Sequence, residues 1–472
     1  MLFGNLIAYA KVYSEHNYVI DEINNKKIAI PKVYNVKSTI VQIKGYTGKV
    51  ENGQFLSKPE DLFVSKQGNI YISDTGNNRV LMLKTNGEFI NEITTCNGIS
   101  LNAPTGVFVS QDEHIYIADS QNSRILHLSK DFNFIEQFVA PKSDLLDENM
   151  IFQPTKIGLN PANGYIYVTY GKHFMTIDSQ NRFKGFIGSK MINFTFADKI
   201  IKAFGTREQK NIIIKKEPPA YNNLFVMDSG LIYAVNEDKS SQINLINSAG
   251  NNIFPVKFYG EPTYEKMKGL VMPNITDITV DKDNFITILD GKTAKLYQYD
   301  KEGNMLCSFG DKGSTNGNLQ NPTAISINEN GEILVLDALS NSVIIFMPTD
   351  FILTVHKAIN YSFNGEYELA LKEWNAVNIK SSNYPVSKNM LGKINFKNEN
   401  YSEAMKHYLV SNNRVGYGTA FEKLRYTLSS KYFVYVVIAL ILFAFAIKFI
   451  IKRLSKIAKH ISNLLYGIER RK

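Results

Sequence analysis

The stretch that decides the fold is YISDTGNNRV, residues Tyr71–Val80. It begins as a run of β-formers, stops at Asp74 and resumes at Arg79 after four residues typical of turns. Nearly the same text returns 45 residues later as YIADSQNSRI, residues Tyr116–Ile125. The flanks agree as well, since KPEDLFVSKQGNIYISD resembles APTGVFVSQDEHIYIAD. The chain therefore contains an internal repeat, and the repeat period must be read before anything else.

Further copies of the repeat begin at Pro154, Pro273 and Pro322, and a weaker copy begins at Asn222. Each copy alternates apolar and polar residues over four or five positions, turns, and alternates again, which is the period of half-buried strands. Two more β-rich runs follow in each unit, so a unit predicts a four-stranded antiparallel sheet. Such units of about 40 to 50 residues are typical of propeller blades. We predict an all-β, six-bladed propeller over residues 39–347.

Three features resemble the NHL-repeat β-propellers. They are the lead-in GNLQNPT (Gly317–Thr323), its relative GQFLSKPE (Gly53–Glu60), and an Asp-x-x-Asn-x-Arg run in the first two units. The third and fourth units depart from this pattern, because Thr169 stands at the expected aspartate position and the Asn222 copy lacks the proline lead-in. The resemblance implies a propeller in which this run belongs to each blade.

The aspartates of this run, Asp74 and Asp119, end the second strand of their blades. A carboxylate at that place can accept backbone N–H bonds and close a turn. Arg79 and Arg124 begin the third strand, where each can pair with a carbonyl or carboxylate. We interpret the motif as blade scaffolding, because a catalytic group has no reason to recur in several blades.

The sixth blade shows only three strands before the pattern becomes helical. The run STIVQIKGY, Ser38–Tyr46, precedes the first blade and alternates like a strand. We predict that Thr39–Lys44 supplies the missing outer strand and so closes the ring, which removes two open sheet edges.

The net charge of +9 is concentrated at the C-terminus: from Lys431 onward the chain carries nine Lys or Arg and one acid, which leaves +1 for the rest. A near-neutral propeller gives little support to nucleic-acid binding. The segment 432–451 has 20 residues and one charge, so we predict a transmembrane helix. The basic, amphipathic tail 452–472 then lies in the cytoplasm and on the inner leaflet.

With the tail inside, the propeller is expected to be extracellular, in a single-pass protein of the cell membrane. This topology requires an export signal, and residues 1–10 resemble the end of one. The alternative is a tail-anchored protein with a cytosolic propeller.

Between propeller and membrane, residues 365–377 align with residues 399–411 at an offset of 34. Ala358 and Gly392 stand where two helices of a hairpin must approach closely. This pattern resembles the tetratricopeptide repeat (TPR), so residues 350–430 predict a short TPR-like helical stalk. A separate insertion between the third and fourth blades has helix-like apolar spacing over residues 192–201.

Related propellers include lactonases and an amidating lyase that hold a metal in the central channel. Here the starts of the inner strands offer Asp61 and Asp277 but no histidine, and the seven histidines are scattered. A three-ligand metal site is thus poorly supplied, and no nucleophile–base pair is visible. We expect no catalytic residue, no metal and no cofactor.

We therefore predict a non-enzymatic, membrane-anchored binding or scaffold protein whose partner is a protein or a carbohydrate-related ligand. A second partner, itself a membrane protein, is expected at the stalk. The resemblance to exported NHL proteins of Gram-positive bacteria suggests carbohydrate uptake or envelope assembly. The alternatives are a channel-metal hydrolase or lyase and a cytosolic tail-anchored scaffold. The predicted ligand-binding rim at the propeller mouth comprises Glu60, Asp74, Asn77, Thr105, Asp119, Asn122, Thr155 and Thr323.

Overall fold

The computed structural model describes residues 17–21, 26–48, 55–143, 146, 151–171, 173–187, 205–206, 221–238, 240–265, 269–315 and 317–469. The predicted signal remnant at 1–10 and the helix-like insertion at 192–201 lie outside these residues. The chain divides into two compact units. One comprises Met1–Asn360 with Ala376–Tyr384, and the other comprises Tyr361–Asn375 with Pro385–Lys472.

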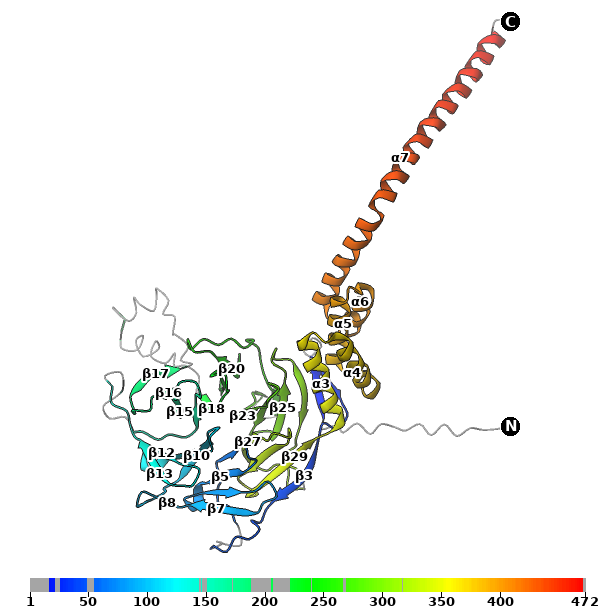
Figure 1. The fold of residues 1–472 in the computed structure, drawn as a ribbon. Coiled ribbons are helices and arrows are strands. Elements are labelled where there is room, and N and C mark those ends of the chain that lie inside the picture. The colour runs from blue at the N-terminus through cyan, green and yellow to red at the C-terminus, as the bar shows by residue number, and fades with distance from the viewer. Residues whose placement is uncertain are drawn as a thin grey trace, which may run out of the picture. The chain divides into compact units, whose positions relative to one another are not determined.

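The first unit is a six-bladed β-propeller whose blades follow one another in chain order around a ring (Figure 1). Blade one contains β4 (Asp61–Val64), β5 (Ile70–Asp74), β6 (Arg79–Leu83) and β7 (Phe89–Ile93). Blade two contains β10 (Pro104–Val109), β11 (Ile115–Asp119), β12 (Arg124–Leu128) and β13 (Phe134–Phe138). Blade three contains β14 (Ile157–Leu159), β15 (Ile166–Tyr170), β16 (His173–Ile177) and β17 (Phe183–Ile187).

The second half of the ring follows the same plan. Blade four contains β18 (Tyr221–Val226), β19 (Ile232–Asn236) and β20 (Ile243–Ile246). Blade five contains β23 (Ile275–Val280), β24 (Ile286–Asp290), β25 (Lys295–Tyr299) and β26 (Met305–Phe309). Blade six contains β27 (Pro322–Ile327), β28 (Ile333–Asp337), β29 (Ser342–Pro348) and β3 (Tyr34–Ile40). Two short hairpins, β8 (Thr95–Cys96) with β9 (Ile99–Ser100) and β21 (Thr263–Glu265) with β22 (Gly269–Val271), decorate the loops.

The ring closes as the sequence predicts, because β3 pairs antiparallel with β29 as the outer strand of blade six. The predicted bounds of this strand were wrong: it runs from Tyr34 to Ile40 and not from Thr39 to Lys44. Pairing with β29 sets the register, and beyond Ile40 the chain turns to blade one, where the Lys44 N–H donates to the Gly87 carbonyl at 3.0 Å. Alternation alone cannot mark where one partner is exchanged for another.

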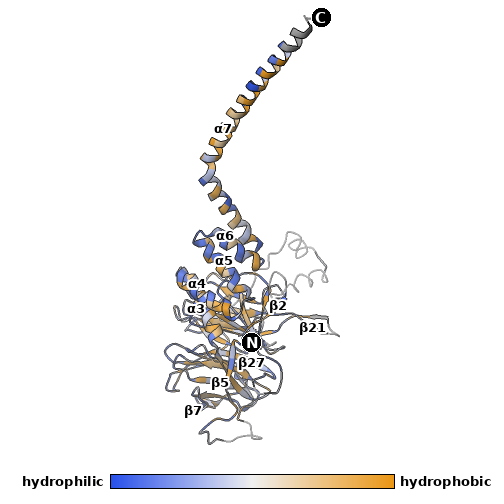
Figure 2. Ribbon diagram, turned by 90° about the vertical axis from the view of Figure 1, so that its right-hand side faces the viewer, coloured by the Kyte–Doolittle hydropathy of each residue, from blue (hydrophilic) through white to orange (hydrophobic). Residues whose placement is uncertain are grey.

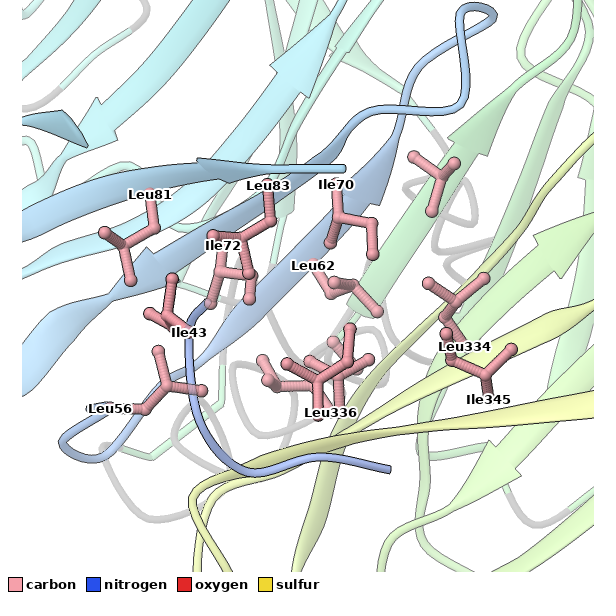
Figure 3. Packing of buried hydrophobic residues seen from close by; sticks show 14 residues of the cluster. Ile43, Leu56, Leu62, Ile70, Ile72, Leu81, Leu83, Leu334, Leu336 and Ile345 are labelled. Atoms are coloured by element: carbon pink, nitrogen blue, oxygen red, sulfur yellow. The ribbon is translucent and has the colours of Figure 1, made fainter. Parts of the chain in front are cut away.

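Apolar side chains from blades one and six pack together at this closure (Figure 3). The cluster includes Leu62 and Leu81 from blade one and Leu334 and Ile345 from blade six, each less than one-tenth exposed. Ile40 from β3 belongs to the same cluster. The closing strand is therefore held by side-chain burial as well as by backbone pairing.

Blade five carries two further strands that the sequence did not reveal, β1 (Tyr18–Asp21) and β2 (Lys26–Ala29). β1 pairs with β26 through Tyr18 and Ser308, and β2 pairs with β1. The resulting sheet has six strands. Residues before the predicted propeller thus belong to it.

The helices are α3 (Asp350–Asn364), α4 (Tyr367–Lys380), α5 (Pro385–Lys397), α6 (Tyr401–Val410) and α7 (Arg414–Glu469). Within the second unit, α5 and α6 form an antiparallel-type hairpin. A Cβ added to Gly392 would lie 2.7 Å from the Tyr408 ring, so the predicted close approach at this glycine is confirmed. The Trp374 indole N–H also donates to the Ser362 hydroxyl at 3.0 Å.

The 56-residue helix α7 contains a long apolar stretch, visible as the orange part of the helix in Figure 2. An 18-residue window of this helix is long and apolar enough to cross a membrane and is not buried by the rest of the protein. The helix has no amphipathic division there, because apolar side chains are exposed on every side.

Candidate functional site

The repeated aspartates fasten each blade to the loop that enters it. The Asp74 carboxylate accepts the Ser57 backbone N–H at 2.7 Å, and Asp119 accepts the Asn102 N–H at 2.8 Å. Asp290 and Asp337 accept backbone N–H groups from their own lead-in loops in the same way. Because the aspartate is used identically in four blades, its scaffolding role is confirmed.

The arginines of the motif complete this buried network. Arg79 Nε donates to Asp74 at 2.8 Å, and Arg124 Nε donates to Asp119 at 2.7 Å. The other nitrogens of Arg79 reach the Glu92 carboxylate at 2.9 Å and the Phe55 carbonyl at 2.6 Å. The predicted pairing of both arginines with carboxylates is thus confirmed.

Blade three was aligned wrongly by one residue. Ile157 pairs with Val168 as Leu62 pairs with Ile72 in blade one. The residue at the aspartate position is therefore Tyr170, which pairs with His173. Thr169 occupies the place of the preceding serine, a shift that the sequence hides because both threonine and serine suit a strand of this kind.

The eight predicted rim residues lie at the starts of the inner strands and in the turns after the second strands. Asn77 and Asn122 each donate an amide N–H to the aspartate of their own turn at 2.8 Å. The Thr105 and Thr323 hydroxyls donate to the Pro154 and Pro59 carbonyls of the following blade, both at 3.2 Å.

β-Bulges explain those two threonines. The register of the inner strand shifts at Thr105 and again at Thr323. A bulge re-aims the side chain of the extra residue, here toward the next blade. Of the remaining rim residues, Thr155 bonds the Thr169 hydroxyl at 2.5 Å and the Glu60 N–H donates to the Ser73 carbonyl at 3.1 Å. These groups link the propeller internally, and a ligand-binding role for the rim stays a prediction.

A cavity of about 880 Å³ occupies the propeller centre. It is lined by inner strands of all six blades and by the loops that connect the first and second strands. Those loops lie at the end of the channel opposite the predicted rim, because an inner strand starts at one end and finishes at the other. None of the eight predicted residues lines the cavity.

One position of the inner strand repeats as a ring at the inner end of this cavity. Equivalent residues in the six blades are Asp61, Gly106, Lys156, Asn223, Asp277 and Ala324. A Cβ on Gly106 would lie 1.9 Å from the Thr155 carbonyl oxygen, so only glycine fits at that place. Its missing side chain leaves room for the Lys156 ammonium to reach past blade two and pair with the Asp61 carboxylate.

Asp277 is the second buried carboxylate of the ring, with 3% of its surface exposed. It accepts the backbone N–H groups of Ile325 at 2.6 Å and Ile278 at 2.7 Å, and it bonds the Asn223 amide. Burial raises the pKa of Asp277 to about 7, although the charge of Lys156 and these N–H bonds oppose the rise. One lysine therefore serves two buried aspartates.

The open end of the cavity carries polar and charged side chains. Lys66 of blade one lies 3.8 Å from the Asp228 carboxylate of blade four, and the Gln111 amide of blade two bonds that same carboxylate. The three side chains cross the mouth, and they are exposed. Exposed pairs of this kind contribute about 0–1 kcal/mol, so they oppose entry of a ligand only weakly.

Helix α3 contributes to the wall of the mouth through Leu353 and His356. The His356 ring stacks on Phe285 with centroids 3.9 Å apart, and its Nε2 lies 2.8 Å from the Gln298 amide oxygen. Burial lowers the pKa of His356 to about 3, so this imidazole is neutral at physiological pH. The start of the helical region is thus built into the cavity.

A chain of three polar side chains leads from the mouth through blade two. His114 Nδ1 lies 2.9 Å from His127 Nε2, and His127 Nδ1 lies 2.9 Å from the Glu136 carboxylate. Burial lowers the pKa of His127, and Glu136 opposes that shift. The sequence analysis treated these histidines as scattered. The signal that would have joined them is the strand register, since His127 pairs with Tyr116 and with Glu136.

No group of three or more His, Cys, Asp or Glu side chains able to hold a metal occurs among the residues that the structure describes. The channel offers Asp61 and Asp277, as the sequence suggested, but Lys156 already occupies the place beside Asp61. The ammonium group supplies there the positive charge that a metal would bring in a carboxylate site.

No family model and no curated protein matches the chain. A streptogramin B lyase structure shares 14% identity, covering 62% of this chain and 94% of its own, with a TM-score of 0.41. A catalytically inactive virginiamycin B lyase from Staphylococcus aureus with quinupristin shares 14% identity over 64% and 86%, with a TM-score of 0.40. A Bacteroides thetaiotaomicron structural genomics protein shares 12% over 69% and 80%, with a TM-score of 0.44. These similarities concern the fold.

Proposed function

We propose that this protein is a membrane-anchored binding protein that takes a ligand into the central cavity of its propeller. The cavity itself carries the proposal, because its volume of about 880 Å³ falls within the range of sites for small molecules. Three partly exposed phenylalanines, Phe63, Phe108 and Phe225, supply apolar surface, while both ends carry polar groups. This combination suits a ligand with an apolar body and polar ends.

The membrane anchor is the apolar stretch of α7, residues 432–451. A helix of 20 residues spans about 30 Å, the thickness of the hydrocarbon core. Four basic residues follow it closely, Lys452, Arg453, Lys456 and Lys459. The positive-inside rule then supports a cytoplasmic tail and an extracellular propeller, as in exported NHL-repeat proteins.

The helical region supports a second binding role in the proposal. The tight contact of Gly392 with Tyr408 is the packing expected of a TPR-like hairpin. A short stalk of this kind beside the membrane suits a membrane-protein partner. We infer a receptor-like arrangement in which the propeller takes the ligand for an uptake or envelope-assembly system.

Ligand capture by the full chain tests the cavity. We expect Leu353→Trp to weaken retention of the co-purifying or screened ligand by about tenfold or more, because the indole fills the mouth. Leu353 is 39% exposed, so the larger side chain costs little stability. Leu369→Trp is the matched control, since Leu369 is 44% exposed on α4 and lines no cavity. Mass spectrometry of the bound fraction measures the loss.

Two results would redirect the proposal. Loss of the ligand in Glu60→Ala with Thr323→Ala, but not in Leu353→Trp, would place binding at the rim. Recovery of a chemically altered ligand, with the alteration lost in His114→Asn, would instead favour the second candidate, a hydrolase or lyase in which His114 is the general base. The chain from His114 to Glu136 is the observation behind that candidate.

Proteolysis of intact cells tests the topology. We expect protease added outside to remove the propeller and to leave a fragment that begins before Tyr432, because the propeller is proposed to be extracellular. Immunodetection of a tag at each end of the chain follows both products. Full protection until the cells are lysed would show instead that the propeller is cytosolic.

A further inference from the structure

We propose that the cavity selects a small organic cation, an amine or guanidinium group carried on an apolar body. This inference rests on the proposed binding function and adds the chemical class of the ligand. It is drawn from the charges, the unpaired carboxylates and the aromatic walls of the cavity.

The lining of the cavity is acidic, in contrast to the chain as a whole. Seven aspartates and glutamates and three lysines line it, a formal excess of four negative charges, whereas the chain carries +9. A cavity with low-dielectric walls and charges of one sign concentrates ions of the opposite sign. Cations are therefore favoured over neutral and anionic molecules of the same shape.

The lysines leave two of the more buried carboxylates without an ion pair. Lys156 pairs with Asp61, and Lys66 lies near Asp228. Asp277 and Asp281 form no ion pair among the described residues, and their oxygens accept N–H groups, including that of Phe285 at 2.8 Å from Asp281. Burial raises the pKa of Asp281, like that of Asp277, to about 7. A cation that entered the cavity would supply the missing charge.

The walls suit the body of such a ligand. Phe63 and Phe108 meet edge to face with centroids 5.1 Å apart, and both are partly exposed to the cavity, as is Phe225. Aromatic faces attract organic cations and bury apolar groups. An inorganic cation would gain nothing from these rings, and a sugar would leave the acidic groups uncompensated.

Three probes that share one indole body and differ in charge test this inference. Tryptamine is a cation at pH 7, indole-3-ethanol is neutral and indole-3-acetate is an anion. With the full chain in detergent at low salt, we expect tryptamine to bind about tenfold more tightly than indole-3-ethanol and indole-3-acetate to bind most weakly. Isothermal titration measures the three affinities.

Variants at the mouth locate the effect. Asp112→Asn with Asp283→Asn neutralises two exposed acids of the cavity, and we expect it to weaken tryptamine about threefold or more while leaving indole-3-ethanol unchanged. Asp131→Asn with Glu88→Gln is the control, because these exposed acids lie outside the cavity. Equal loss in both double variants would show that surface charge, and not the cavity, attracts the probe.

The inference is overturned if indole-3-ethanol or indole-3-acetate binds as tightly as tryptamine, or if tryptamine does not bind at about 1 mM. A neutral or anionic ligand that Leu353→Trp displaces would overturn the cation alone and leave the binding function standing. A ligand that no cavity variant affects would overturn both.

Discussion

Asp119→Ala is expected to lower the free energy of unfolding of the propeller by about 3–5 kcal/mol, because it leaves a buried guanidinium without its carboxylate. Asp119 is fully buried and Arg124 is 3% exposed. The change also removes the acceptor for the Asn102 backbone N–H and the Asn122 amide. Urea unfolding of the full chain, followed by circular dichroism, measures the loss.

Two variants frame this result. Asp119→Asn keeps one oxygen as an acceptor and is expected to lose less than Asp119→Ala. Asp131→Ala removes an exposed aspartate two blade strands away from the network and should change stability by no more than about 0.5 kcal/mol. A stability of Asp119→Ala within about 1 kcal/mol of the parent would show that the motif does not hold the blade together.

Deletion of residues 1–41 is expected to abolish cooperative unfolding of the propeller. It removes β3, which forms six paired positions with β29, together with β1 and β2 of blade five. An open ring exposes the edges of two blades and the apolar cluster between blades six and one. Because a domain is stable by only about 5–15 kcal/mol, this loss is comparable with the whole. Calorimetry of the full and shortened chains compares the transitions.

A pair of neighbouring residues isolates the closure from the deletion itself. Ile40 is 9% exposed within the cluster, whereas Val41 is 56% exposed. Ile40→Asp buries a charge and should cost about 3 kcal/mol or more, and Val41→Asp should cost little. An unchanged transition in the deletion variant, or equal effects at the two positions, would mean that β3 is not needed to close the ring.

The blades were predictable from the sequence because their signals are local. Alternation within a strand, and an aspartate that bonds residues three and five positions later, both act over one turn of chain. The number of blades followed from counting copies of this local pattern. The outer strand of blade six was predictable because the sixth copy lacked a strand and an unused strand preceded the first copy.

Positions that depend on a partner strand were predicted less well. The bounds of β3 and the alignment of Thr169 were each displaced, because a register is set by hydrogen bonds to another strand. β1 and β2 were missed for the same reason: four-residue strands carry too short a pattern, and only their place beside β26 makes them part of a sheet.

The sequence by itself determined a repeated blade, its buried Asp–Arg pairs and an apolar helix long enough for a membrane, since each is written in neighbouring residues. Only the tertiary structure decided which end of the channel is hollow and which side chains share it. Lys156 meets Asp61 across 95 residues of sequence because Gly106 leaves the intervening place empty. Such a ring exists only once six separate strands converge on one axis, and no local pattern encodes that convergence.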